Sequence, residues 1–524
     1  MPGVALISWF LLGDAQAQEI PCLTPTLMSQ WGEKPIMKHY PELPPAPAKA
    51  ERDAWGDWPN STYSENFVVK WGTDSISSAK INTLIGAFEA AWSVQVDDME
   101  YSAPVGSKDY RFNVYIAESG PDTLNSYGAA GYFSYDHDGW PIIVIAKASL
   151  SAPDDGAGTA VHEFFHAVQD AMGTWEYTGD GGWYYEATAC WIVPEVLPND
   201  LTYLSFILGY GLLPNYPVNF FDYWDTGNFT EYHHYGAFIF PRYLTEKVFD
   251  WELIRDSWRE DNAGNDPLLA LEKLIEKRGG DFEQIFSDFA AHNATWDYEH
   301  GAYYEQYVDY YADQFPQWDC RVSDTLGKNG DGEWREANPA CLPQRYGYNL
   351  IELENPKNGH LALSFRGEER GSMNTQAAWK LQFVREGGAQ EQYVPLEMEG
   401  VEADLALCDV GDENSIYLVV SSHSPTLRSG EVFEYSYKLE RVDTHPLCEG
   451  GSDPEDTSNP DPDPDPDPKD TSNPDTTPGG LSVVAEPGGC ACSMAIGPST
   501  MPGRFVFVGL CSVLFWTRRR GDTA

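Results

Sequence analysis

The stretch that decides the fold is "TAVHEFFHAVQDAM", residues 159–172, because it places two histidines on an amphipathic pattern. At about 100° per residue, His162 and His166 lie within about 40° of each other on a helix. A helix that packs through the opposite, apolar side presents both imidazoles away from its packed face. Two histidines one turn apart can chelate one metal ion. The apolar positions are Val161, Phe164, Phe165, Val168 and Met172.

The core of this stretch, His162–His166, has the pattern H-E-x-x-H. Neutral imidazoles are ligands suited to zinc. A glutamate directly after the first ligand reaches metal-bound water without displacing it and can take its proton. We therefore expect His162 and His166 to bind zinc and Glu163 to act as the general base. Asp170 falls on the side of Glu163, and we expect it to be a solvated charge on the helix surface.

A third protein ligand is needed, because catalytic zinc has three such ligands and one open position. In "GGWYYEATACW", residues 181–191, Glu186 follows His166 after 19 intervening residues. The segment Trp183–Ile192 is compatible with a helix that turns this glutamate back toward the first helix. Glu186 is therefore the expected third ligand. Asp180 is the alternative, although its Gly-rich surroundings are more typical of a solvated turn.

Together these two segments resemble the gluzincins, in which H-E-x-x-H is followed by a second helix that carries a Glu ligand and then small residues. "HEFFHAVQD…WYYEATACW" also resembles a group of secreted myxobacterial metalloproteases, over roughly residues 65–315 and the C-terminal tail. The resemblance implies a zincin-like fold, one zinc ion held by His162, His166 and Glu186, Glu163 as the base, and a protein or peptide substrate. The sequence departs from the pattern at Cys190, where thermolysin-like gluzincins place an aspartate that orients a zinc histidine. The partner that fixes these imidazoles is left unassigned.

A peptidase also needs a hydrogen-bond donor for the oxyanion of its transition state. The segment 230–248, "TEYHHYGAFIFPRYLTEKV", has an aromatic cluster at the start of an apparent buried helix. Tyr235 is the first candidate donor and His234 the second. The alternative for both is a packed, hydrogen-bonded aromatic side chain. The strand "IIVIAKAS", residues 142–149, is the expected edge for pairing with an extended peptide.

The bulk composition sets the broader limits. A chain of 524 residues with 42% apolar residues predicts two or more domains. The net charge of −48 excludes nucleic acid and anionic lipid surfaces as partners. Strand and helix patterns alternate before residue 183, which predicts a mixed α+β domain, and short alternating runs in 345–446 predict an all-β sandwich. The expected division is a signal peptide (1–17), an irregular lead-in or short pro-segment (18–64), a metallopeptidase-like domain (65–318), a Cys-bracketed loop (319–344), a β-sandwich (345–448), a Pro/Asp-rich spacer (449–480) and a sorting or anchor tail (481–524).

The N-terminus is typical of a secretory signal, because an apolar run at residues 4–12 precedes the small-residue site Ala15-Gln16-Ala17. Export permits disulfides. We expect Cys320 to pair with Cys341 and Cys408 with Cys448. For Cys22 and Cys190, both a pair and free thiols are left open.

The last segment contains a 12-residue apolar run, Phe505–Trp516, followed by Arg518–Arg520. A stable membrane span needs about 20 residues. The tail resembles the Gly-Cys sorting tails of myxobacterial surface proteins, which implies processing and lipid attachment at Cys490 or Cys492. The alternative is a simple membrane anchor. In both cases the membrane is reached only through this tail or a lipidated cysteine.

The sequence thus predicts an exported zinc metallopeptidase, extracellular or anchored at the outer surface. The alternative is a surface adhesion or binding protein, whose sandwich does the work and whose zinc site is structural or degenerate. Calcium is compatible with such an acidic chain, but "KNGDGEWRE", residues 328–336, lacks the glutamate that closes a calcium-binding loop. The oligomeric state is left open.

Overall fold

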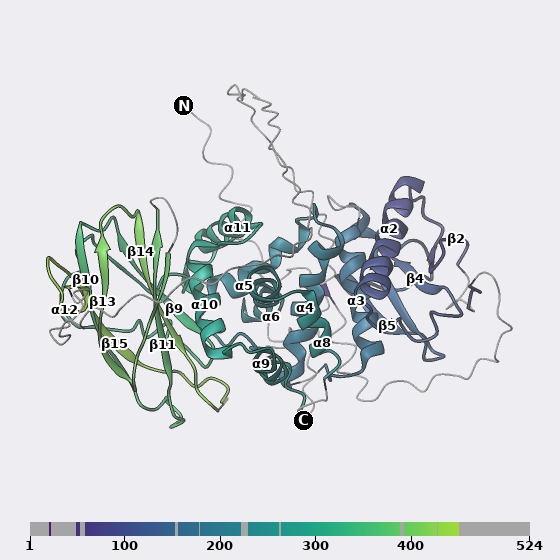
Figure 1. Ribbon diagram of the computed structural model, residues 1–524. Helices are drawn as coiled ribbons and strands as arrows, with labels where there is room; N and C mark the ends of the chain where they lie inside the picture. The colour runs from purple at the N-terminus through teal and green to yellow at the C-terminus, as the bar shows by residue number, and fades with distance from the viewer. Residues whose placement is uncertain are drawn as a thin grey trace, which may run out of the picture. The chain divides into compact units, whose positions relative to one another are not determined.

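The computed structural model describes residues 20–22, 49–52, 58–151, 156–177, 179–221, 229–260, 264–387, 392–426 and 428–449 (Figure 1). The chain divides into two compact units, residues 1–454 and 455–524, and the second lies outside the described residues. The expected signal peptide, spacer and sorting tail also lie outside them. Among the described helices, none is long and apolar enough to cross a membrane.

The N-terminal region is built on a mixed six-stranded sheet. Its strands are β1 (Ile20–Cys22), β2 (Asn60–Tyr63), β3 (Phe67–Trp71), β4 (Phe112–Ala117), β5 (Ala129–Tyr135) and β6 (Pro141–Ala146). They lie in the order β1-β5-β6-β4-β3-β2. Strands β3, β4 and β6 are parallel, whereas β5 is antiparallel to β6. Both central strands, β4 and β6, are buried along their whole length, which explains why β6 is continuously apolar and why Asn113 is the one polar residue of β4.

Helices α2 (Ser78–Ala91) and α3 (Ala157–Met172) pack against one face of this sheet. The ring of Phe164 on α3 lies 5.1 Å from that of Phe67 on β3 and 6.0 Å from that of Trp92 after α2. The apolar side of the helix therefore faces the sheet core, as the sequence pattern predicted. Helix α3 ends where Gly173 takes a φ of 64°, a left-handed conformation that favours glycine.

A helical layer follows along the chain. Its α-helices are α4 (Gly182–Val196), α5 (Ile207–Leu212), α6 (His233–Gly236), α7 (Ile239–Tyr243), α8 (Trp251–Ser257), α9 (Pro267–Lys277), α10 (Phe282–Thr295) and α11 (Gly301–Gln314). The start of α9 shows how sequence sets these limits: the Asp266 side chain accepts a hydrogen bond from the Leu269 amide, and Pro267 occupies the first turn. Helices α4 to α10 share one aromatic-rich core with α2, α3 and the first sheet.

The C-terminal part of the described chain is β-rich. Its elements are β7 (Asp324–Leu326), β8 (Arg335–Glu336), β9 (Tyr348–Glu354), β10 (Gly359–Gly367), β11 (Trp379–Glu386), β12 (Gln392–Leu396), β13 (Glu402–Val410), β14 (Ser415–Ser422), β15 (Tyr435–Val442) and α12 (Pro446–Glu449). They form a four-stranded sheet, β13-β10-β15-β8, and a five-stranded sheet, β12-β11-β14-β9-β7. Both sheets contribute to a second hydrophobic core.

Two predicted disulfides are present, Cys320–Cys341 and Cys408–Cys448. Cys190 is free and buried. The β-rich part contacts helix α10 directly, because the amide nitrogen of Gln382 on β11 donates to Ser287 at 3.0 Å and to Asp288 at 2.6 Å.

The predicted mixed α+β architecture with a β-rich C-terminal part is confirmed. One expectation about the sheet was wrong: the strand within residues 142–149 is not an edge. It belongs to β6, which pairs with β5 on one side and β4 on the other. Strand β5, whose sequence "AAGYFSY" is less apolar, lies beside α3 and pairs with β6 on one side and with β1, the outermost strand, on the other.

Candidate metal centre

Two helices from different parts of the chain bring the predicted ligands together. His162, Glu163 and His166 lie on α3, and Glu186 lies on α4. Helix α4 is buried along nearly its whole length, so Glu186 can leave solvent only if a cationic or hydrogen-bonding partner meets it. The His162 and His166 side chains are that partner. One ligand atom from each of His162, His166 and Glu186 lies within 4.8 Å of the others.

The three ligand atoms form a compact triangle. The Nε2 atoms of His162 and His166 are 3.2 Å apart. The carboxylate oxygens of Glu186 lie 3.1 Å from His162 Nε2 and 3.5 Å from His166 Nε2. A tetrahedral zinc ion with ligands at about 2.0–2.1 Å places neighbouring ligand atoms about 3.3 Å apart. The donor set and its spacing therefore fit zinc.

Glu186 is held as a carboxylate in a fully buried position. The Tyr177 hydroxyl donates to its Oε1 at 2.6 Å. Burial alone raises the pKa of Glu186, but the charge of His166 and the hydrogen bonds of both histidines outweigh burial and hold it well below its ordinary value. Burial likewise lowers the pKa of His166, yet Glu186 reverses the sign and raises it overall. Tyr177 was missed from the sequence, because it lies in the loop between α3 and α4.

A glutamine supplies the imidazole partner that the sequence left unassigned. The Oε1 atom of Gln169 lies 2.7 Å from Nδ1 of His166, and Gln169 in turn donates to the Tyr185 carbonyl at 2.9 Å and to the Thr188 hydroxyl at 3.0 Å. An Nδ1–H donated to Gln169 leaves Nε2 as the lone-pair atom that faces the other ligands. The signal was readable, since Gln169 lies about 20° from His162 on the helix.

The other histidine has a weaker partner. The sulfur of Cys190 lies 3.8 Å from Nδ1 of His162. Burial raises the pKa of Cys190 well above its ordinary value, so the sulfur stays a thiol. The position that carries an aspartate in thermolysin-like gluzincins thus contacts the first histidine here, but as a neutral and polarizable group.

Glu163 is fully buried on the side of α3 that meets strand β5. A Cβ atom added to Gly131 would lie 2.9 Å from Cγ and 3.2 Å from Oε1 of Glu163. Only glycine allows the β5 backbone to approach the glutamate so closely. Asp170, expected in solvent, is instead buried and accepts a hydrogen bond from the Tyr135 hydroxyl of β5. That expectation was wrong because α3 is covered on this side as well.

The alternative third ligand is not brought to the histidines. Asp180 is exposed on the short 3-10 helix Gly179–Gly181, and partial burial of its side chain, together with the charge of Asp266, raises its pKa. The structure places Glu186 in the cluster, whereas Asp180 is outside it.

The two candidate oxyanion donors lie on α6 and are buried. The Tyr235 ring stacks on Phe206 with centroids 5.2 Å apart, and the Phe206 ring lies 6.4 Å from the ring of His162. His234 contacts the Tyr235 ring at 4.5 Å and Phe221 at 5.0 Å. The ring of Phe206 thus contacts both Tyr235 and the candidate ligand His162, and His234 contacts Tyr235. The role of Tyr235 and His234 as donors is still a prediction.

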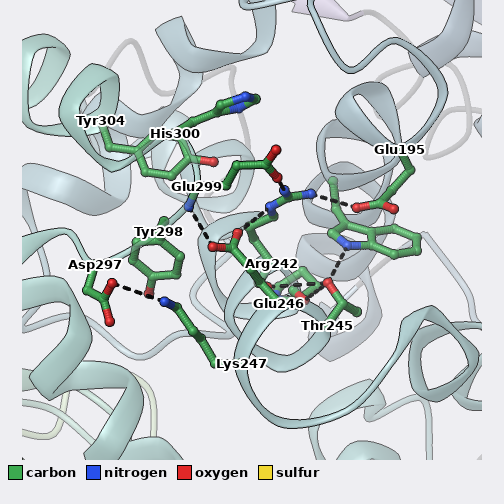
Figure 2. A network of polar contacts seen from close by, with 12 residues as sticks. Glu195, Arg242, Thr245, Glu246, Lys247, Asp297, Tyr298, Glu299, His300 and Tyr304 are labelled. Atoms are coloured by element: carbon green, nitrogen blue, oxygen red, sulfur yellow. Dashed lines mark hydrogen bonds and ion pairs between the residues drawn. The ribbon is translucent and has the colours of Figure 1, made fainter. Parts of the chain in front are cut away.

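A buried ion-pair network fixes the far end of α4 (Figure 2). Arg242 on α7 donates to Glu195 at 2.6 Å, to Glu246 at 2.9 Å and to Glu299 at 2.9 Å. Its side chain is only 8% exposed. A guanidinium this deeply buried needs such partners, because an uncompensated buried charge is strongly destabilising. Because Glu195 and Glu186 share α4, the network also restrains the helix that carries the third ligand.

Comparison with known proteins places the chain in a family without assigning an activity. The model of a family of unknown function, DUF6055, matches residues 43–441, so the chain belongs to that family. No curated protein matches the sequence.

Three solved structures resemble parts of the chain only weakly. The pre-peptidase C-terminal domain of a collagenase from Bacillus anthracis is 14% identical, with a TM-score of 0.15, over 22% of this chain and 93% of that one. The module TmCBM61, solved with beta-1,4-galactotriose, is 17% identical, with a TM-score of 0.13, over 21% and 66%. A family GH115 4-O-methyl-alpha-glucuronidase is 12% identical, with a TM-score of 0.14, over 66% and 54%. These TM-scores are too low to support an argument about fold or function.

Proposed function

We propose that this protein is an exported zinc metallopeptidase of the gluzincin type with a zincin-like N-terminal fold. One observation carries the proposal: His162, His166 and Glu186 form a triangle of the size that zinc requires, with Glu163 beside it on the same helix. The mixed sheet supports it, since its antiparallel strand β5 runs beside the helix with the H-E-x-x-H motif. A peptide substrate is the expected partner.

The chain's own residues divide the chemistry as follows. His162, His166 and Glu186 would hold the ion, which when bound supplies Lewis-acid activation of a water and of a substrate carbonyl. Glu163 takes the proton of the attacking water and passes it to the leaving amine. Gln169 holds the tautomer of His166, and the Tyr177 hydroxyl orients Glu186. Tyr235 and His234 are the proposed donors to the oxyanion.

The proposed location is outside the cell. Two disulfides among the described residues support an oxidising compartment. The predicted secretory signal would direct export, and the Pro/Asp spacer and tail would carry the folded part at the cell surface.

A second candidate function is a surface binding protein with a structural zinc site. The burial of the ligands favours it, because His162, His166 and Glu186 are 6%, 1% and 0% exposed. Structural zinc sites are closed, whereas catalytic ones keep an open position. The two candidates therefore differ in one measurable property, the hydrolysis of a peptide bond by the zinc-loaded protein.

The deciding experiment compares the wild type with Glu163→Gln. Bound zinc is measured by elemental analysis, and hydrolysis is measured on casein and on a quenched fluorescent peptide library. Loss of the general base should reduce kcat by about 10²–10⁴-fold and leave zinc bound. Asp170→Asn is the matched control, since it changes a buried carboxylate on the same helix outside the ligand set, and it should keep both properties. Stoichiometric zinc with no hydrolysis by the wild type, in the intact chain and after removal of its N-terminal lead-in, would establish the structural alternative.

A further inference from the structure

The edge of the sheet beside the metal centre is occupied by the chain's own N-terminal segment. Strand β1 pairs in parallel with β5, with Ile20 opposite Ala129 and Cys22 opposite Gly131. The next described residues, 49–52, rejoin the domain just before β4, where Ala50 bridges to Tyr110. Strand β1 precedes residue 43, at which the family match begins.

The pairing includes Gly131, the residue of β5 that lies closest to the proposed general base, Glu163. Gly131 is the residue whose backbone lies against Glu163, since an added Cβ would come within 2.9 Å of its Cγ. Neighbouring strands lie about 4.8 Å apart. The backbone of Cys22 therefore runs one strand beyond the residue that contacts the proposed general base.

An unoccupied strand edge offers a row of backbone donors and acceptors, to which an extended peptide can add as a further strand. Along Ala129–Gly131 those groups face β1 in the intact chain. A peptide can therefore pair with this part of β5 only after β1 has left.

We propose that β1 is an intramolecular inhibitor, which fills the peptide-docking edge of β5 until the lead-in is cut. This inference rests on the proposed function. Three paired residues bind weakly by themselves, but a covalent tether keeps their effective concentration in the range of about 1 mM. Cleavage between Cys22 and Lys49 turns the pairing into an intermolecular one, and β1 then dissociates on dilution.

The test uses the full chain with a recognition site for a sequence-specific protease in place of residues 40–47. Two readouts are taken before and after the cut: amide hydrogen exchange of residues 129–131 and hydrolysis of the fluorescent peptide library. Both should rise at least 10-fold on cleavage. The same site placed at residues 456–463 is the matched control, and its cleavage should change neither readout.

Adding the synthetic peptide QEIPCLTPT, residues 18–26, to the cut protein should restore slow exchange and inhibit hydrolysis. The same peptide N-methylated at Ile20 and Cys22 lacks the two amide donors of the paired residues and should do neither. Unchanged exchange at residues 129–131 after cleavage overturns the inference. If exchange responds to cleavage and to the peptide while the zinc-loaded cut protein hydrolyses nothing, the docking of β1 is supported and the proposed function alone fails.

Discussion

Two regions of the molecule bury histidines and treat them in opposite ways. In the metal centre, His166 lies beside Glu186, and its pKa is raised although the ring is buried. Elsewhere, burial lowers the pKa of His233, on α6 in the helical layer, to about 3. It does the same for His423, which follows β14 and contacts Phe286 of α10. His233 packs among the rings of Tyr210, Tyr216 and Phe220. Burial alone therefore does not distinguish the candidate ligands from packed histidines, whereas a buried carboxylate beside the ring nitrogens does.

The largest expected difference between the two regions is in metal binding. His166→Phe should lower zinc affinity by more than about 100-fold, since changes even to groups behind a ligand cost 10–100-fold. His233→Phe keeps the packed ring and should leave zinc binding and hydrolysis within a factor of about three. Chelator competition at pH 7 measures both affinities, and circular dichroism checks that both variants fold. Equal losses of zinc affinity in the two variants would mean that His166 is no more a zinc ligand than His233 is.

An intermediate effect is expected behind the ligands. Gln169→Leu removes the acceptor for Nδ1 of His166 and should weaken zinc binding by about 10–100-fold. The matched control is Thr188→Val, which removes one hydrogen bond to Gln169 but leaves its bond to the histidine. Chelator competition should show a several-fold smaller loss for this control. If both variants bind zinc as the wild type does, Gln169 does not orient the ligand.

The smallest expected effect concerns pH and His423. Burial, reinforced by Lys380 and Arg345, holds the pKa of His423 at about 3, against 6.5 in an unfolded chain. The unfolded state therefore binds the proton first, and stability is lost as pH falls from 6.5 toward 3 at about 1.4 kcal/mol per pH unit. Between pH 6.5 and 5, His423→Phe should remove about 2 kcal/mol of the fall in unfolding free energy seen for the wild type.

Urea unfolding of the zinc-free protein at the two pH values measures this difference. A fall of equal size in His423→Phe and in the wild type would mean that His423 titrates normally in the fold. His166 provides the contrast, because its raised pKa gives stability that is present at low pH and lost as pH rises.

Features set by residues close together in the sequence could be predicted, whereas those set by distant residues could not. The α3 pattern placed His162 and His166 on one side and the phenylalanines on the other, because helical periodicity is local. Glu186 followed from its spacing within a known arrangement of two helices. The strand order did not follow, because pairing partners far apart in sequence leave no periodic signal, and β6 was therefore mistaken for an edge.

The residues that support the ligands were harder to recognise for different reasons. Gln169 lies on the histidine side of α3, whereas the gluzincin pattern places the residue that orients a zinc histidine four positions after Glu186. Tyr177 reaches Glu186 from an irregular loop, where the spacing of residues does not predict which way a side chain points.

Strand β12 could not be predicted from its composition, because it contains Pro395, which argues against a strand. The proline is tolerated because β12 lies at a sheet edge.

The Cys408–Cys448 disulfide determines where tension on the C-terminal end of the described chain enters the fold. Cys448 lies on α12, next to the end of the described chain, and its partner lies on β13. Tension applied beyond Glu449 is therefore transmitted through a covalent bond into β13, which is paired along β10 from Gly359 to Arg366. Without the disulfide, the same tension would act on β15, the strand that precedes α12, and would separate it from its neighbours one residue at a time. Reducing this single bond should lower the force at which the sandwich opens.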